Sequence, residues 1–231
     1  VYLDPDTAMN PHTLQACLCA AGAAVLATDL VMQGVVRNAF ASVRPPGHHA
    51  TRDRSMGFCI FNNVAVAARH AIAEYGLTRI AIIDFDVHHG NGTEDIFSDD
   101  PTVLMCSTFQ HPFYPYSGTE HPANNMVNIP LNAGSGSRQF RDAVTQAWMP
   151  ALESFSPELV LISAGFDAHL EDDMASLSFR DEDYAWVTAQ LTAFANTHCA
   201  GRVVSVLEGG YDLSALARSV VQHLRVLAEL H

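Results

Sequence analysis

Residues 82–92, IIDFDVHHGNG, constrain the fold of this chain more than any other part of its sequence. An apolar run ends there in Asp84, Asp86 and His88, residue types that bind metal ions. Because alternate side chains of an extended backbone share one face, these three can converge at the carboxyl end of a strand. Ligand crevices of open α/β sheets form at that same end. The segment therefore predicts a buried strand that delivers metal ligands to one edge of a sheet.

Apolar, strand-like runs alternate with amphipathic stretches along the rest of the chain. The strand candidates lie at 39–43, 79–85, 102–108, 125–131, 158–164 and 202–208. Helical periodicity fits 11–28, 62–75, 137–155, 181–198 and 213–230, with Asn62 and Asp181 near helix starts and Gly76 and Gly201 near helix ends. We therefore expect one α/β domain over residues 1–231, with helices on both faces of a central, mostly parallel sheet.

Composition restricts the classes of partner. Of 231 residues, 48% are hydrophobic and 16% charged, which suits one globular domain. The balance of 25 acidic against 12 basic residues leaves no basic stripe for a phosphate backbone, so we expect cationic substrates and no direct nucleic-acid partner. No unbroken run of about 18 apolar residues appears, so we expect no membrane contact. The 5 cysteines form no Cys-x-x-Cys pair, which indicates free thiols and a cytoplasmic location.

Polar, chemically capable residues follow four of the predicted strands. The segments are RPPGHHA, DFDVHHGNG, SAGFDAH and EGGYD. They carry His48 and His49, then Asp86 and His88, then Asp167, and finally Tyr211. Because the carboxyl ends of parallel strands meet at one edge of a sheet, these side chains are predicted to form a catalytic site.

The motifs RPPGHHA, GFCIFNN, DFDVHHGNGT, SAGFDAH and LEGGYDL, in this order and spacing, resemble the histone deacetylase family of the arginase-deacetylase fold. The resemblance is greatest to its class II branch and to bacterial histone deacetylase-like amidohydrolases and acetylpolyamine amidohydrolases. It implies one Zn²⁺ per chain, bound by Asp86, His88 and Asp167, with Fe²⁺ left open as the ion used in the cell. Two carboxylates and one imidazole leave coordination positions for water and substrate, as catalytic zinc requires.

The resemblance also assigns the groups around the metal. His49 would be the general base, because an imidazole that titrates at about pH 6.5 can both collect and return a proton. His48 would bind Asp84, and His49 would bind Asn91, where other branches of the family carry Asp. Since an amide carries no full negative charge, we expect His49 to be less basic than an Asp-paired histidine. Tyr211 would donate a hydrogen bond to the developing oxyanion.

Two further sites come from the resemblance alone. Gly57, Phe58 and Tyr114 would line a narrow tunnel for an acylated alkylamine, because apolar walls with a buried polar end suit that ligand. A structural K⁺ would be enclosed by oxygen atoms of Asp84, Asp86, His88, Ser107 and Thr108. Oxygen ligands suit such a hard cation.

The implied function is a zinc-dependent amidohydrolase that removes acetyl or a related short acyl group from N-acetyl-lysine side chains or similar acylated alkylamines. Acetylpolyamines are an alternative substrate, and the acidic run at 171–173 could face such a cation. Arginase-type hydrolysis is disfavoured because Gly90 and His169 stand where its two-metal site needs carboxylates. A catalytically silent binding or scaffold protein is the alternative from another class, and a homo-oligomer is left open.

The start of the chain bears on the tunnel rim. Relatives usually carry several dozen residues before the position that matches Val1, including a loop that forms one tunnel wall. The resemblance therefore implies that the usual N-terminal segment is missing, because the sequence is partial or because the rim is unusually open. Asp4 and Asp6 both lie near the place where relatives carry a carboxylate that holds the substrate backbone, and the spacing does not choose between them.

Overall fold

The central sheet of the computed structural model, which describes residues 1–230, contains six strands within that range. They are β3 (Asn38–Ala41), β4 (Ile80–Asp84), β5 (Val103–Gln110), β6 (Met126–Leu131), β7 (Leu159–Ala164) and β8 (Val203–Leu207). Their order across the sheet is β3-β8-β7-β4-β5-β6, and every neighbouring pair is parallel. The expected strands are thus present, with ends shifted by at most two residues, and the parallel α/β prediction is confirmed.

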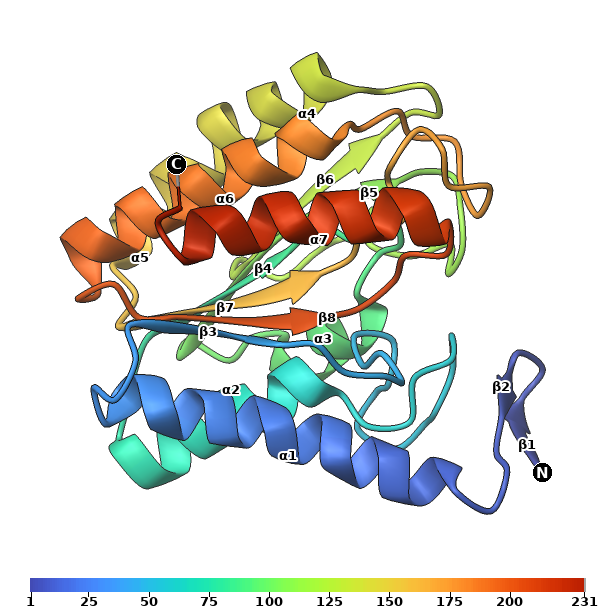
Figure 1. The fold of residues 1–231 in the computed structure, drawn as a ribbon, viewed down its shortest axis with the longest axis horizontal. Coiled ribbons are helices and arrows are strands. Elements are labelled where there is room, and N and C mark those ends of the chain that lie inside the picture. The colour runs from blue at the N-terminus through green and yellow to red at the C-terminus, as the bar shows by residue number, and fades with distance from the viewer. Residues whose placement is uncertain (231) are drawn as a thin grey trace.

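Helices cover both faces of this sheet, which gives the expected three layers (Figure 1). One layer contains α1 (Thr13–Met32), α2 (Asn63–Tyr75) and α3 (Asn91–Phe97), and the other contains α4 (Ser137–Ala143), the π-helical turn η1 (Val144–Trp148), α5 (Met149–Phe155), α6 (Asp181–His198) and α7 (Leu213–Leu227). Every residue of β4, β5, β7 and β8 is buried, which explains why these strands read as continuous apolar runs.

Local signals fix several helix boundaries. Asn62 caps α2 by accepting the backbone N–H of Ala65 at 3.0 Å, and Gly76 ends that helix with φ of 66°. The helix expected at 137–155 is instead divided by η1. Pro150, in the first turn of α5, lacks the N–H that would continue an α-helical ladder, so the preceding turn widens. The short helix α3 and the N-terminal hairpin of β1 (Tyr2–Asp4) and β2 (Thr7–Ala8) were not predicted.

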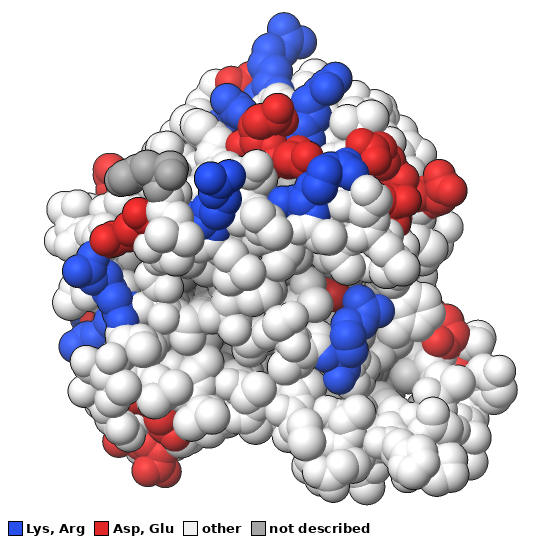
Figure 2. Space-filling model, viewed as in Figure 1, with Lys and Arg blue, Asp and Glu red and all other residues white. Residues whose placement is uncertain are grey.

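Helix α1 bears on the expectation about membrane-spanning segments. The helix is long and apolar enough, by length and composition alone, to cross a membrane, with a mean hydropathy of 1.7 in its best window. Polar residues such as Gln15 and Asp29 interrupt its apolar run. In this fold 33% of that window is buried, and Ala20, Ala24, Ala27 and Val31 face the protein interior. The surface over α1 is largely uncharged, whereas acidic and basic side chains mix over α4, α6 and α7 (Figure 2). Such a helix is weak support for a membrane span.

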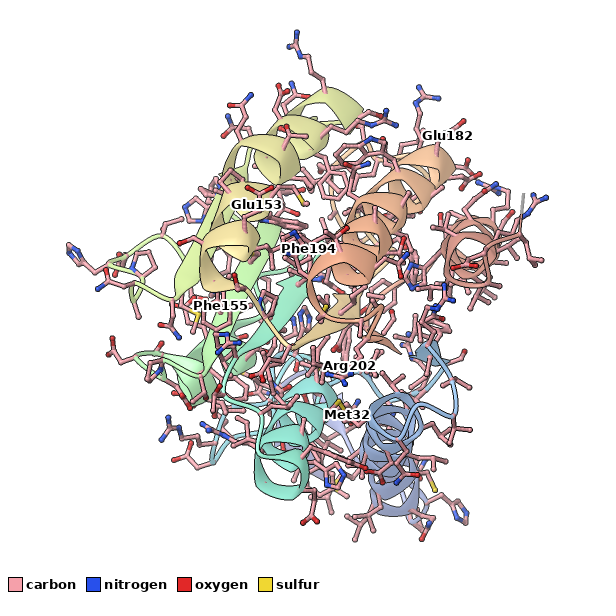
Figure 3. All side chains as sticks on the ribbon, turned by 90° about the vertical axis from the view of Figure 1, so that its left-hand side faces the viewer. Met32, Glu153, Phe155, Glu182, Phe194 and Arg202 are labelled. Carbon is pink, nitrogen blue, oxygen red and sulfur yellow. The ribbon has the colours of Figure 1, made fainter. Side chains whose placement is uncertain are left out.

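The carboxyl ends of the strands and the hairpin lie on the right in Figure 1. Figure 3 looks onto the opposite end, where Met32, Phe155 and Arg202 stand at element boundaries.

Within residues 1–230 all five cysteines are free thiols, as expected, and four of them are buried.

Candidate active site

Asp86, His88 and Asp167 form a buried group at the carboxyl ends of β4 and β7. Their potential ligand atoms all lie within 4.8 Å of one another. The Nδ1 atom of His88 is 2.9 Å from Asp86 Oδ1 and 3.2 Å from Asp167 Oδ2. Apart from this contact with His88, Asp167 Oδ2 has no hydrogen-bond partner among the described residues, and burial followed by the charge of Asp86 raises the pKa of this carboxyl. A bound divalent cation would bind this oxygen and offset the negative charge that burial disfavours. These residues therefore fit a metal site.

Backbone groups hold the two carboxylates in place. Asp86 Oδ2 accepts the N–H of Gly209 at 2.8 Å, and Asp167 Oδ1 accepts the N–H of Val87 at 2.9 Å. Two glycines permit this close approach of loops. A Cβ atom on Gly165 would lie 2.2 Å from Asp86 Oδ2, and one on Gly209 would lie 2.2 Å from Asp167 Oδ2. The loops after β4, β7 and β8 therefore interlock around the carboxylates.

The tandem histidines occupy the loop after β3, and both are buried. His48 Nδ1 lies 2.9 Å from Asp84 Oδ2, and His49 Nδ1 lies 2.7 Å from Asn91 Oδ1, so both expected hydrogen bonds are present. Because the amide oxygen of Asn91 can only accept, His49 carries its proton on Nδ1 and keeps Nε2 free to accept another. His49 and His88 are close, with ring centroids 5.7 Å apart.

The electrostatics divide the two histidines. Burial opposes the charged form of His48, but the carboxylates of Asp86 and Asp84 outweigh it and raise its pKa well above the ordinary value. Burial, together with positive charge at His48 and His88, lowers the pKa of His49 well below the ordinary value. The lowered pKa favours the neutral form of His49, which agrees with the expectation of a less basic histidine.

Glu208 is a site residue that the sequence interpretation missed. Its side chain is fully buried at the end of β8, where Oε2 accepts the N–H groups of Gly47 at 2.6 Å and His48 at 3.1 Å. Its Oε1 accepts the hydroxyl of Ser163 at 3.0 Å, and burial raises the pKa of the carboxyl to about 7. Glu208 therefore ties the histidine loop to the sheet. The signal available in sequence was an acidic residue directly after a buried strand.

Tyr211 lines the pocket above the metal group, as predicted. Asp172 Oδ2 accepts the backbone N–H groups of Tyr211 at 2.6 Å and Asp212 at 3.0 Å, which fixes the turn after β8. Burial, followed by the charges of Asp167 and Asp86, raises the pKa of the phenol, so the hydroxyl keeps its proton and remains a donor.

The acidic run at 171–173 does not line the pocket, contrary to the suggestion that it faces a cationic ligand. Asp172 is buried beneath the turn of Tyr211, and Glu171 pairs with Arg218 at 2.7 Å. Met174, which follows the run, lines the pocket instead. This wall is therefore apolar.

A pocket of about 140 Å³ leads to the metal group. It is lined by Asp6, His49, Gly57, Phe58, His88, Phe113, Tyr114, Met174 and Tyr211, which include all three residues expected in the tunnel. Phe113, which was not predicted, stacks on the imidazole of His88 with centroids 5.4 Å apart. The two N-terminal carboxylates occupy different positions in the structure. Asp6 lines the pocket, whereas Asp4 pairs with Arg54 at 2.6 Å.

His89 anchors the loop that carries Phe113 and Tyr114. Its Nδ1 atom lies 2.8 Å from Ser117 Oγ and its Nε2 atom 2.8 Å from Glu94 Oε2. The same Glu94 oxygen accepts from Asn128 Nδ2 at 2.7 Å, and Asn128 also binds the carbonyl of Gly118 at 3.0 Å. Of these two adjacent histidines, His88 thus belongs to the metal group, whereas His89 supports the aromatic wall of the pocket.

The residues expected around K⁺ lie beside the metal group. Ser107 faces Asp84 in the register of β4 and β5, and Thr108 follows it. Within residues 1–230 the hydroxyl oxygens of Ser107 and Thr108 are buried without hydrogen-bond partners. These unpaired hydroxyl oxygens, next to the carboxylate of Asp84, are ligands that suit a second cation that prefers oxygen, such as K⁺.

Comparison with known proteins gives a consistent picture. A family model described as "Histone deacetylase domain" matches residues 2–227. "Histone deacetylase 10, chloroplastic" of Oryza sativa subsp. japonica is 43% identical over 224 residues, covering 92% of this chain and 51% of the relative. "Polyamine deacetylase HDAC10" of Mus musculus is 43% identical over 230 residues, covering 94% and 34%. A crystal structure of the HDA15 HD domain superimposes with a TM-score of 0.93 at 36% identity, covering 100% of this chain and 67% of that one. The chain thus spans about half the length of the rice relative.

Proposed function

The chain belongs to the histone deacetylase family, and we propose that it is a zinc-dependent amidohydrolase that removes acetyl or a related short acyl group from N-acetyl-lysine side chains of peptides and proteins. One observation carries the proposal. The buried group of Asp86, His88 and Asp167 lies at an aromatic pocket that also presents a neutral imidazole and a protonated phenol. Such a combination serves hydrolysis of an unactivated amide.

We propose that Asp86, His88 and Asp167 hold the catalytic ion, Zn²⁺ by preference, with Fe²⁺ as the alternative that the same donors accept. When bound, this ion supplies Lewis acidity that polarises the substrate carbonyl and makes water a better nucleophile. The orphaned hydroxyls of Ser107 and Thr108, with oxygens of Asp84, Asp86 and His88, support a structural K⁺ in the adjacent position.

The side chains of this protein then divide the proton chemistry. His49 accepts a proton from the attacking water at Nε2 while Asn91 fixes the ring through Nδ1. The same atom of His49 then returns the proton to the leaving amine. The hydroxyl group of Tyr211 donates a hydrogen bond to the carbonyl oxygen as negative charge develops there. His48 is hydrogen-bonded to Asp84 beside these groups, and the carboxylates of Asp86 and Asp84 favour its protonated form.

The pocket walls favour a neutral alkyl chain over a cationic one. Phe58, Phe113, Tyr114 and Met174 offer apolar or aromatic surface, which suits the methylene chain of acyl-lysine. Acetylpolyamines are the second candidate substrate. Asp6, the one acidic side chain among the described lining residues, and the similarity to a relative named as a polyamine deacetylase favour this candidate.

The test is an assay of purified, metal-loaded protein against a panel of acetyl-lysine peptides and acetylpolyamines. We expect turnover of acetyl-lysine peptides that a chelator abolishes and added Zn²⁺ restores, and inhibition by a linear hydroxamate whose alkyl linker enters the pocket. Elemental analysis should find one transition metal ion per chain. Two such ions would favour arginase-type chemistry, and none after loading would favour a scaffold role.

A further inference from the structure

The N-terminal hairpin is mostly exposed, yet one of its side chains is buried. Of the described residues 1–10, Thr7 alone is buried, with 1% of its surface exposed. Its Oγ1 atom accepts the backbone N–H of Phe58 at 3.1 Å and donates to Asp6 Oδ1 at 2.8 Å. The same Asp6 oxygen accepts the backbone N–H of Gly57 at 3.1 Å. Two linked side chains thus bind two successive N–H groups of the tunnel wall.

The turn that they bind has an unfavourable backbone conformation. Gly57 has φ of 57° and Phe58 has φ of 67°, so both lie in the left-handed region. Glycine adopts this region freely, but a bulky side chain such as phenylalanine does so only where surrounding contacts enforce it. The acceptors on Asp6 and Thr7 are such contacts. The ion pair between Arg54 and Asp4 is a weaker restraint, because the Arg54 side chain is 63% exposed and surface pairs contribute little.

The same turn borders the reacting groups. A Cβ atom on Gly57 would lie 2.3 Å from Cδ2 of His49, so the turn runs directly against the proposed base. The ring of Phe58 packs edge-on to the ring of Tyr211, with centroids 6.1 Å apart. A relaxed turn would therefore move Phe58 out of the pocket wall, away from Tyr211.

We propose that Asp6 and Thr7 are positioning residues that hold the Gly57–Phe58 turn in its left-handed conformation and so keep Phe58 in the pocket wall. The kinetic consequence rests on the proposed deacetylase function, whereas the structural consequence does not. The metal carboxylates and Glu208 are bound by the N–H groups of Gly47, Val87 and Gly209, none of which belongs to this turn. Loss of the restraint should therefore weaken substrate binding more than the chemical step.

The experiment compares Thr7→Val with Thr7→Ser. Valine keeps the shape of threonine but removes the oxygen, whereas serine keeps the oxygen. In Thr7→Val we expect KM for an acetyl-lysine peptide to rise roughly 5- to 10-fold while kcat changes less than about 2-fold, as loss of one buried hydrogen bond implies. Thr7→Ser should behave like the wild type. Hydrogen exchange at the Phe58 amide should quicken roughly tenfold in Thr7→Val alone.

A second pair, Asp6→Ala against Asp6→Asn, tests the same restraint through the Gly57 amide and serves if Thr7→Val does not fold. Asparagine retains the accepting oxygen, so it should preserve protection of the Gly57 amide against hydrogen exchange, and alanine should not. Because Asp6 also lines the pocket, amide exchange rather than KM is the deciding measurement for this pair. Unchanged protection and KM in both Thr7→Val and Asp6→Ala would overturn the proposal. So would a fall in kcat with loss of metal, since that indicates a general structural defect. If the wild type hydrolyses no acyl substrate, the proposed function fails, and amide exchange alone still decides this inference.

Discussion

The metal-binding floor of the pocket and its aromatic rim are held in different ways. On the floor, Asp86 and Asp167 are buried and bound by backbone groups of neighbouring loops. On the rim, Phe58 is 38% exposed and Met174 39% exposed, and the walls depend on side-chain hydrogen bonds from a hairpin and a loop. Segments with few buried contacts open at lower free energy than core strands. The positions of the proposed metal ligands are therefore fixed by the fold, whereas the pocket walls depend on restraints that a few substitutions can alter.

Asp167→Ala should have the largest effect, because it removes a ligand from the floor. We expect loss of the metal ion and a fall in kcat/KM of roughly 10³-fold or more. Elemental analysis and the peptide assay measure the two effects. Asp173→Ala, which alters an exposed carboxylate nearby, is the matched control and should keep both metal and activity. Stoichiometric metal in Asp167→Ala would refute the assignment of the floor.

Tyr211→Phe separates the phenol from the metal. Removal of one hydrogen-bond donor to the developing oxyanion should lower kcat by roughly 10²- to 10³-fold, with metal content and KM nearly unchanged. Steady-state kinetics with parallel metal analysis provide the measurement. Nearly full turnover by this variant would mean that the phenol is structural and that another group donates to the oxyanion.

His223 tests whether the core beneath the floor holds a buried histidine in its neutral form. Its ring packs against Phe85 and Phe166, which adjoin the metal ligands in sequence, and its nitrogens bind Thr188 and Ser205 at 2.7 and 2.9 Å. Burial lowers its pKa to about 3. The unfolded chain binds a proton near pH 6.5 and the folded protein does not, so this contribution to stability is complete above that pH and declines below it by about 1.4 kcal/mol per pH unit.

Urea unfolding at pH 7.5, 6.5 and 5.5 gives the measurement for His223. The free energy of unfolding of the wild type should fall more steeply below pH 6.5 than that of His223→Leu, which removes the titrating ring while it keeps an apolar side chain. Equal slopes in the two proteins would show that His223 is not held neutral in the core.

Glu94→Ala should have the smallest effect, because it loosens only the rim. Without this carboxylate, His89 and Asn128 lose a shared acceptor and the loop that carries Phe113 and Tyr114 gains freedom. We expect KM to rise by about 3- to 5-fold at nearly constant kcat. Glu94→Gln, whose amide oxygen can still accept, should restore the wild-type KM. A fall in kcat and metal content would instead place Glu94 in support of the floor.

The floor was predictable from sequence because its residues follow strands directly. Asp86 and His88 follow the apolar run of β4 within four residues, and Asp167 follows that of β7 within three, so all three reach the carboxyl edge of the sheet. The bonds of Glu208 and Asp172 could not be predicted, because their partners come from loops more than 35 residues away in the chain. Nor does sequence disclose the left-handed conformation of Phe58, since most bulky residues avoid it. Local periodicity predicts elements, whereas contacts between loops require the folded structure.

The strand order has a consequence for synthesis of the protein. Strand β8 is the last of the sheet to leave the ribosome, yet it lies between β7 and β3, and among the described strands β3 pairs with β8 alone. Strands β4 and β7, which carry the metal ligands, are neighbours and can pair earlier. The loop of His48 and His49 gains its anchor only when Glu208 arrives at the end of β8. A nascent chain can therefore bring β4 and β7 together early, whereas the histidine loop and Asp86 gain their contacts with Glu208 and Gly209 only after β8 is made.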